Sequence, residues 1–71
     1  MIEYTKTKTV KEIKAFGYKD AGIYEANSKK LNELIFKATV NGEYDLILLI
    51  IDETEGREIY HVFFSHRKQG T

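Results

Sequence analysis

The chain has 71 residues with a formal net charge of zero, and it contains no cysteine. The missing cysteines exclude disulfide frameworks and the thiolate zinc sites of fingers and ribbons, and the neutral net charge argues against a globally basic nucleic-acid binder. A hydrophobic content of 42% is enough for a core and argues against disorder, so we expect a single domain over residues 1–71.

The first ten residues are polar and lysine-bearing, without the apolar stretch of a signal peptide. The longest apolar run covers residues 46–51, which is far below the roughly 20 residues that a membrane-spanning helix needs. We therefore expect a cytoplasmic protein without a membrane partner.

Residues 2–5 are compatible with a short edge strand, and Thr9 begins the first expected helix. The run Thr9-Val-Lys-Glu12 fits a capping box, in which the Thr hydroxyl and the Glu carboxylate reach each other's backbone N–H groups. Apolar side chains then recur at helical spacing, at Val10, Ile13 and Phe16. Gly17 supplies a natural stop, so the pattern predicts a helix of two turns.

Residues 18–40 allow competing interpretations. Asp20 can cap a helix that carries Ile23 and Leu31 on one side. A helix that begins at Ser28 instead places four apolar residues on one face: Leu31, Leu34, Ile35 and Ala38. We favour a strand over residues 34–40, because the Asn-Gly pair that follows supplies the two positive φ values of a type I′ hairpin turn.

A second hairpin follows around the short polar loop Asp52-Glu-Thr-Glu-Gly56. The segments 44–51 and 59–64 on either side of it are rich in β-branched and aromatic residues. The fold class that we predict is α+β: one or two short N-terminal helices packed on a three-stranded antiparallel β-meander, with residues 2–5 as an extra N-terminal edge strand.

The central strands are apolar on both faces. A half-exposed antiparallel strand alternates apolar and polar residues, but residues 46–51 are apolar throughout, and residues 59–64 carry apolar side chains on both sides. The helices and the N-terminal strand could wrap the whole sheet. We favour a second copy of the chain, or another protein, over the second face, because large exposed apolar patches are rare on monomers. We therefore expect a homodimer.

Charge is distributed unevenly along the chain. Residues 1–19 contain five lysines against two glutamates, a net charge of +3. Residues 43–58 contain six carboxylates against one arginine, a net charge of −5. A solvated surface explains such a layout, and so does an acidic tip that docks on a basic surface.

No residue pattern predicts a catalytic, metal or cofactor site. His61 and His66 are five positions apart, so on a regular strand they point to opposite faces. We expect His61 to lie in the core or an interface and His66 to be exposed. Ser65 is no catalytic partner for His66, because adjacent strand residues diverge. The acidic loop also lacks the ligand spacing of a calcium loop.

These observations favour a small non-enzymatic binding protein of inhibitor type that occupies a surface on a protein partner. Small chains of this composition, without cysteines or motifs, are common among phage and mobile-element products. We assign partner contact to the acidic hairpin and to the aromatic strand: Asp52, Glu53, Glu55, Tyr60, Phe63 and Phe64. Carboxylates supply polar contact there, and aromatic side chains are favoured in protein interfaces.

Two alternatives stay open. The first is a nucleic-acid-binding module that uses the N-terminal lysines together with Arg67 and Lys68. The second rests on the C-terminal run from Tyr60 to Lys68, which resembles the C-terminal sheet of RelE/ParE-type toxins over about the last third of the chain. That resemblance implies ribonuclease activity on ribosome-bound mRNA, with Tyr60, His66 and Arg67 as the positions that match.

Overall fold

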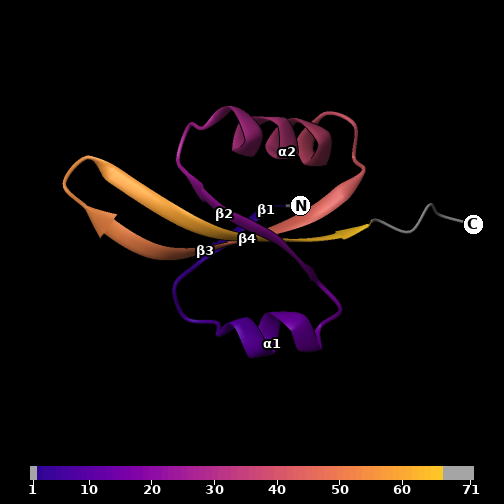
Figure 1. Ribbon diagram of the computed structural model, residues 1–71. Helices are drawn as coiled ribbons and strands as arrows, with labels where there is room; N and C mark the ends of the chain where they lie inside the picture. The colour runs from indigo at the N-terminus through magenta and orange to yellow at the C-terminus, as the bar shows by residue number, and fades with distance from the viewer. Residues whose placement is uncertain (1, 67–71) are drawn as a thin grey trace, which may run out of the picture.

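The computed structural model describes residues 2–66, which form a four-stranded mixed sheet and two helices (Figure 1). The elements in chain order are β1 (Ile2–Thr5), α1 (Val10–Ala15), β2 (Lys19–Glu25), α2 (Lys29–Thr39), β3 (Tyr44–Thr54) and β4 (Arg57–His66). The strand order is β1-β3-β4-β2, with β1 parallel to β3 and the other pairs antiparallel. The α+β class and the N-terminal edge strand are confirmed.

The helix α1 begins where the capping box predicted. The Glu12 N–H donates to the Thr9 hydroxyl at 3.2 Å, and the same hydroxyl lies 3.3 Å from the Glu12 carboxylate. The helix ends at Ala15 with Phe16 as its C-cap, and Gly17 follows with φ of +93°. Ile13 is fully buried, but Phe16 is 72% exposed, so only part of the predicted apolar face meets the core.

The expected meander is wrong, because residues 34–39 lie in α2, with Val40 as its C-cap, and not in a strand. The Ser28 hydroxyl accepts from the Leu31 N–H at 3.3 Å and caps this helix, as the second interpretation of the segment had it. Asn41 does not adopt a positive φ, which rules out a type I′ turn, whereas Gly42 does at +67°. Asn-Gly therefore ends a helix here, with the Glu43 N–H donating to the Lys37 carbonyl at 3.0 Å.

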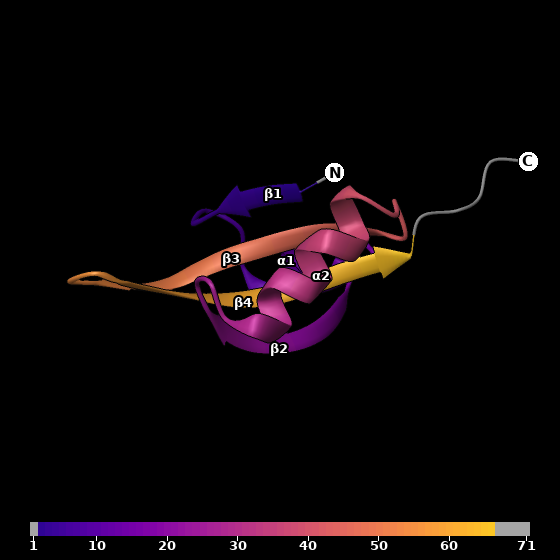
Figure 2. The same ribbon diagram turned by 90° about the horizontal axis from the view of Figure 1, so that it is seen from above.

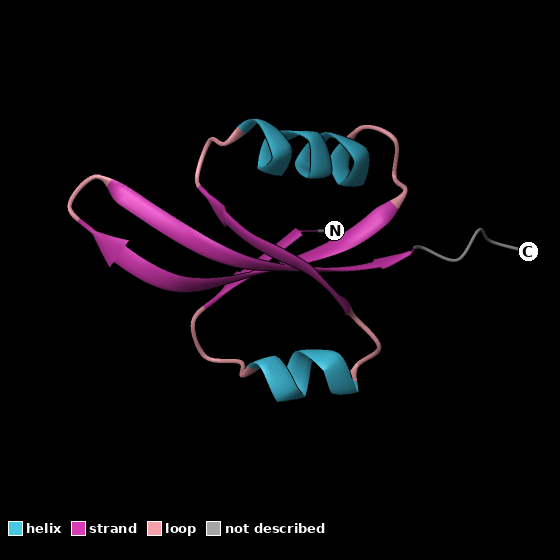
Figure 3. Cartoon of the chain, in the orientation of Figure 1, coloured by secondary structure: helices cyan, strands magenta, loops and turns pink. Residues whose placement is uncertain are grey.

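Asp20 lies on β2 and caps no helix, since residues 19–25 form the strand that pairs with β4. The chain then crosses through α2 to β3 (Figure 3), which places β2 and β3 on opposite sides of β4 (Figure 2). The sequence predicted three consecutively joined strands instead. The sheet is mixed because β1 pairs in parallel with β3.

The two helices lie on opposite faces of the sheet (Figure 1). Under α2 lies a buried cluster of Leu31, Ala38, Leu46, Leu48, Tyr60 and Val62. Under α1 lies a second cluster of Ile13, Ile47, Leu49 and Phe63. Helices of the same chain therefore cover the buried apolar residues on both faces of β3 and β4, although Ile51 stays exposed. This coverage removes the premise on which we inferred that a second copy or another protein covers one face.

The β3–β4 hairpin extends well past the ends of β1 and β2 (Figure 2). It gives the molecule a longest dimension of 45 Å against 26 and 15 Å in the other two directions. Neither helix of the described part of the chain is long and apolar enough to cross a membrane.

Candidate protein interface

The projecting part of the hairpin, residues 51–58, is here called the hairpin arm, and every one of its residues is exposed. Glu53 faces Glu58 and Thr54 faces Arg57 across the two strands. A two-residue turn joins them, with Gly56 at φ of +69°. The polar loop that we expected over residues 52–56 is thus shorter, and its first three residues continue β3.

Four carboxylates lie on the hairpin arm, and cationic side chains elsewhere in the protein neutralise their charge only in part. The Lys6 ammonium lies 2.6 Å from the Glu53 carboxylate, and the Arg57 guanidinium lies 2.5 Å from Glu25 of β2. Within residues 2–66, no ion pair or side-chain hydrogen bond engages Asp52 or Glu55. The arm therefore offers negative charge to a partner.

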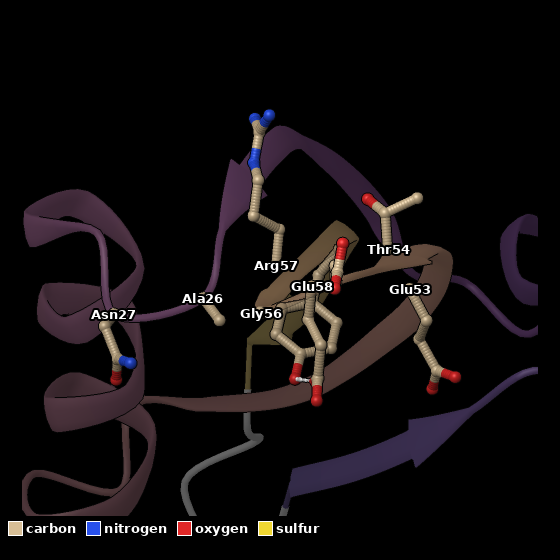
Figure 4. Close-up of a pocket in the computed structure, with 9 residues that line it drawn as sticks. Ala26, Asn27, Glu53, Thr54, Gly56, Arg57 and Glu58 are labelled. Atoms are coloured by element: carbon tan, nitrogen blue, oxygen red, sulfur yellow. Dashed lines mark hydrogen bonds between the residues drawn. The ribbon is translucent and has the colours of Figure 1, made fainter.

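A shallow hollow of about 710 Å³ lies between the arm and the loop that joins β2 to α2 (Figure 4). Ala26 and Asn27 line it from the loop side, and Glu53 and Glu58 line it from the arm. Tyr60 also lines the hollow and donates its hydroxyl hydrogen to Glu58, which raises the pKa of Tyr60 to about 12. The hollow is polar and acidic, which suits a cationic group better than an apolar one.

The residues predicted for partner contact do not share one surface. Asp52, Glu53 and Glu55 are exposed on the arm, as a contact role requires. Phe63 is fully buried and Tyr60 is 7% exposed, so both side chains belong mainly to the core. Phe64 is half-buried and packs edge-on against Tyr44, with 5.3 Å between the ring centroids. Sequence reasoning also missed Lys6, which only the tertiary structure brings to Glu53.

The two histidines lie on opposite faces of the sheet, as their spacing predicted. His66 is exposed and packs beside Tyr44 and Phe64, next to the α2 cluster. His61 lies on the α1 side, where its Nε2 is 2.8 Å from the Asp20 carboxylate. Together with the Gly22 N–H, which is the larger cause, His61 lowers the pKa of Asp20.

The N-terminal lysines do not form one open basic surface. Lys6 pairs with Glu53, and Lys8 pairs with Glu3 at 2.7 Å. Lys11, Lys14 and Lys19 remain exposed on α1 and β2. Arg67, which both alternatives invoke, and Lys68, which the nucleic-acid alternative invokes, lie outside the described residues.

Within residues 2–66, no group of three or more histidine, aspartate or glutamate side chains could hold a metal ion. The observed order of elements also differs from the predicted one, in which the helices precede a three-stranded meander. Neither a family model, nor a curated protein, nor a solved structure matches this chain.

Proposed function

We propose that the chain is a non-enzymatic binding protein of inhibitor type, which docks its hairpin arm on a basic surface of a larger protein. The observation that carries the proposal is the exposed acidic arm that extends past the rest of the sheet (Figure 2). Charge of one sign on a projecting element steers association with a surface of the opposite sign.

Stability of the fold does not explain the arm. Its strands extend beyond both helices, so residues 51–58 bury little apolar surface, and Glu53 and Glu58 face each other as like charges. Surface ion pairs such as Lys6–Glu53 contribute at most about 1 kcal/mol. An exposed element that the fold does not need is a plausible contact surface for a partner.

Of the residues predicted to contact a partner, the proposal keeps the exposed carboxylates of the arm, Asp52, Glu53 and Glu55. Tyr60 and Phe63 are left out because a core side chain cannot reach a partner without opening the sheet. A homodimer stays a prediction. The argument from an uncovered sheet face no longer supports it, since a helix packs on each face of the sheet.

Site-specific photo-crosslinking in cells tests the proposal. A photoreactive amino acid at Thr54, on the arm, is expected to capture a protein, whereas the same amino acid at Asn32, on the exposed side of α2, is expected to capture none. Reversing the charge of three of the four arm carboxylates together (Asp52→Lys, Glu53→Lys and Glu55→Lys) should abolish capture through Thr54.

The circular dichroism spectrum of the triple variant should match that of the parent, since all three side chains are exposed. Undiminished capture by a folded triple variant would contradict the proposal. Crosslinks from Thr54 to nucleic acid alone would contradict it as well and would favour the nucleic-acid alternative.

A further inference from the structure

The outer edge of β3 is only partly paired. β1 pairs in parallel with the first part of β3, and its last residue, Thr5, lies opposite Leu49. β3 itself continues to Thr54, and its other edge stays paired with β4 to the end. Within the described part of the chain, no strand pairs with the outer edge of β3 over residues 50–54.

Local hydrogen bonding explains why β1 stops so early. The Thr5 hydroxyl oxygen accepts from the Thr7 N–H at 3.1 Å, a turn that directs the chain away from β3 and toward α1. Another hollow, of about 220 Å³, lies next to the C-terminal end of β1. It is lined by Lys6 and residues 50–53. The edge is thus open to the approach of another chain.

We propose that residues 50–54 of β3 receive an extended, basic segment of the partner protein as an added strand in line with β1. This inference rests on the proposed function and specifies how the arm binds. An exposed strand edge presents N–H and C=O groups at strand spacing, and strand addition to such edges is a common mode of peptide recognition.

The side chains around this edge select the occupant. Asp52 and Glu53 belong to the edge segment itself, and Ile51, at a bulge between Ile50 and Asp52, is 46% exposed. A segment with lysine or arginine at every second position carries its positive charges on one face, where they complement Glu53 and replace Lys6 there. A second copy of this chain would oppose its own arm carboxylates to these, which is unfavourable in a strand pair.

Binding of a synthetic peptide with alternating lysine and valine, followed by nuclear magnetic resonance, tests the inference. In a strand, N–H groups of consecutive residues point to opposite edges, so the lysine N–H groups lie on one edge and the valine N–H groups on the other. Two matched peptides carry N-methyl groups on the lysine backbone nitrogens or on the valine backbone nitrogens. All three peptides have the same charge.

Strand addition predicts that one N-methylated peptide binds as the parent peptide does, and that the other binds at least about tenfold more weakly. It also predicts that the parent peptide slows amide hydrogen exchange within residues 50–54. Equal binding of all three peptides, with loss of binding in the triple carboxylate variant, would overturn strand addition and leave charge-driven docking of the arm intact. Absence of binding, or slowed exchange on β2 instead, would also overturn it.

Discussion

Asp20 makes one interaction within β2 and one with the neighbouring strand β4. Its carboxylate accepts from the Gly22 N–H at 2.8 Å, and it lies 2.8 Å from Nε2 of His61 on the neighbouring strand. The register of β2 and β4 shifts between Asp20 and Gly22, so the first contact stabilises the irregular position. Both interactions favour the ionised carboxylate, which is why the pKa of Asp20 is lowered.

The Asp20→Asn variant should show how this carboxylate contributes to stability. A carboxyl group with a lowered pKa in the folded state stabilises the fold above its unfolded pKa of about 4, and the contribution is lost as the pH falls through the folded value. Asparagine keeps an acceptor for Gly22 but has no charge.

The measurement is urea unfolding of parent and variant from neutral to acidic pH. The difference in unfolding free energy should be largest at neutral pH and should shrink as Asp20 protonates. The group is largely exposed, so we expect a difference below about 1 kcal/mol. A difference that is constant across this pH range would show that the charge of Asp20 contributes nothing.

The helix α2 is the element whose sequence signals conflict. Residues 34–40 contain strand formers followed by Asn-Gly, yet Leu31 and Ala38 lie in one buried cluster, with Leu34 and Ile35 packed against it. Tertiary packing of that apolar face, together with the Ser28 cap, outweighs the local hairpin signal.

The Ser28→Ala variant should lose about 1 kcal/mol of unfolding free energy, because alanine leaves the Leu31 N–H without its capping acceptor. Chemical denaturation checks the value. Lys30→Ala, on the exposed side of the same first turn, is the matched control and should change stability by less than about 0.5 kcal/mol. Equal effects of the two variants would mean that the cap is not what stabilises the helix start.

The whole molecule has two small cores, one on each face of a single sheet. The α1 core depends on one buried helix residue, Ile13, whereas α2 contributes Leu31 and Ala38. This difference makes α1 the less firmly attached layer. The short helix α1 covers its face of the sheet with only one fully buried side chain, so the sequence alone gives little sign that this face is covered.

The Ile13→Ala variant should lose about 2–5 kcal/mol of unfolding free energy, the range for removing a fully buried isoleucine side chain. Amide hydrogen exchange should show faster opening of α1 than of α2. Phe16→Ala removes a larger side chain of the same helix region, but it is exposed, so its cost should be below about 0.5 kcal/mol. A larger cost for Phe16→Ala would mean that a self-associated state covers that side chain.

The sequence by itself determined what short-range interactions control. The Thr9 capping box, the stop at Gly17, the existence of the β3–β4 hairpin and the opposite orientation of His61 and His66 all follow from residues close together in the chain. The acidic arm was likewise predictable, because its charge is a property of one continuous segment.

Tertiary structure decided the remainder, since it depends on contacts between residues distant in the sequence. The parallel pairing of β1 with β3, the position of β2 beside β4 and the placement of one helix on each face have no local signature. These same contacts bury Tyr60 and Phe63, bring Lys6 to Glu53, and leave residues 50–54 of β3 unpaired along one edge within the described chain. Burial of apolar surface on both faces of the sheet selects this arrangement, because it covers both sides of β3 and β4 within one chain.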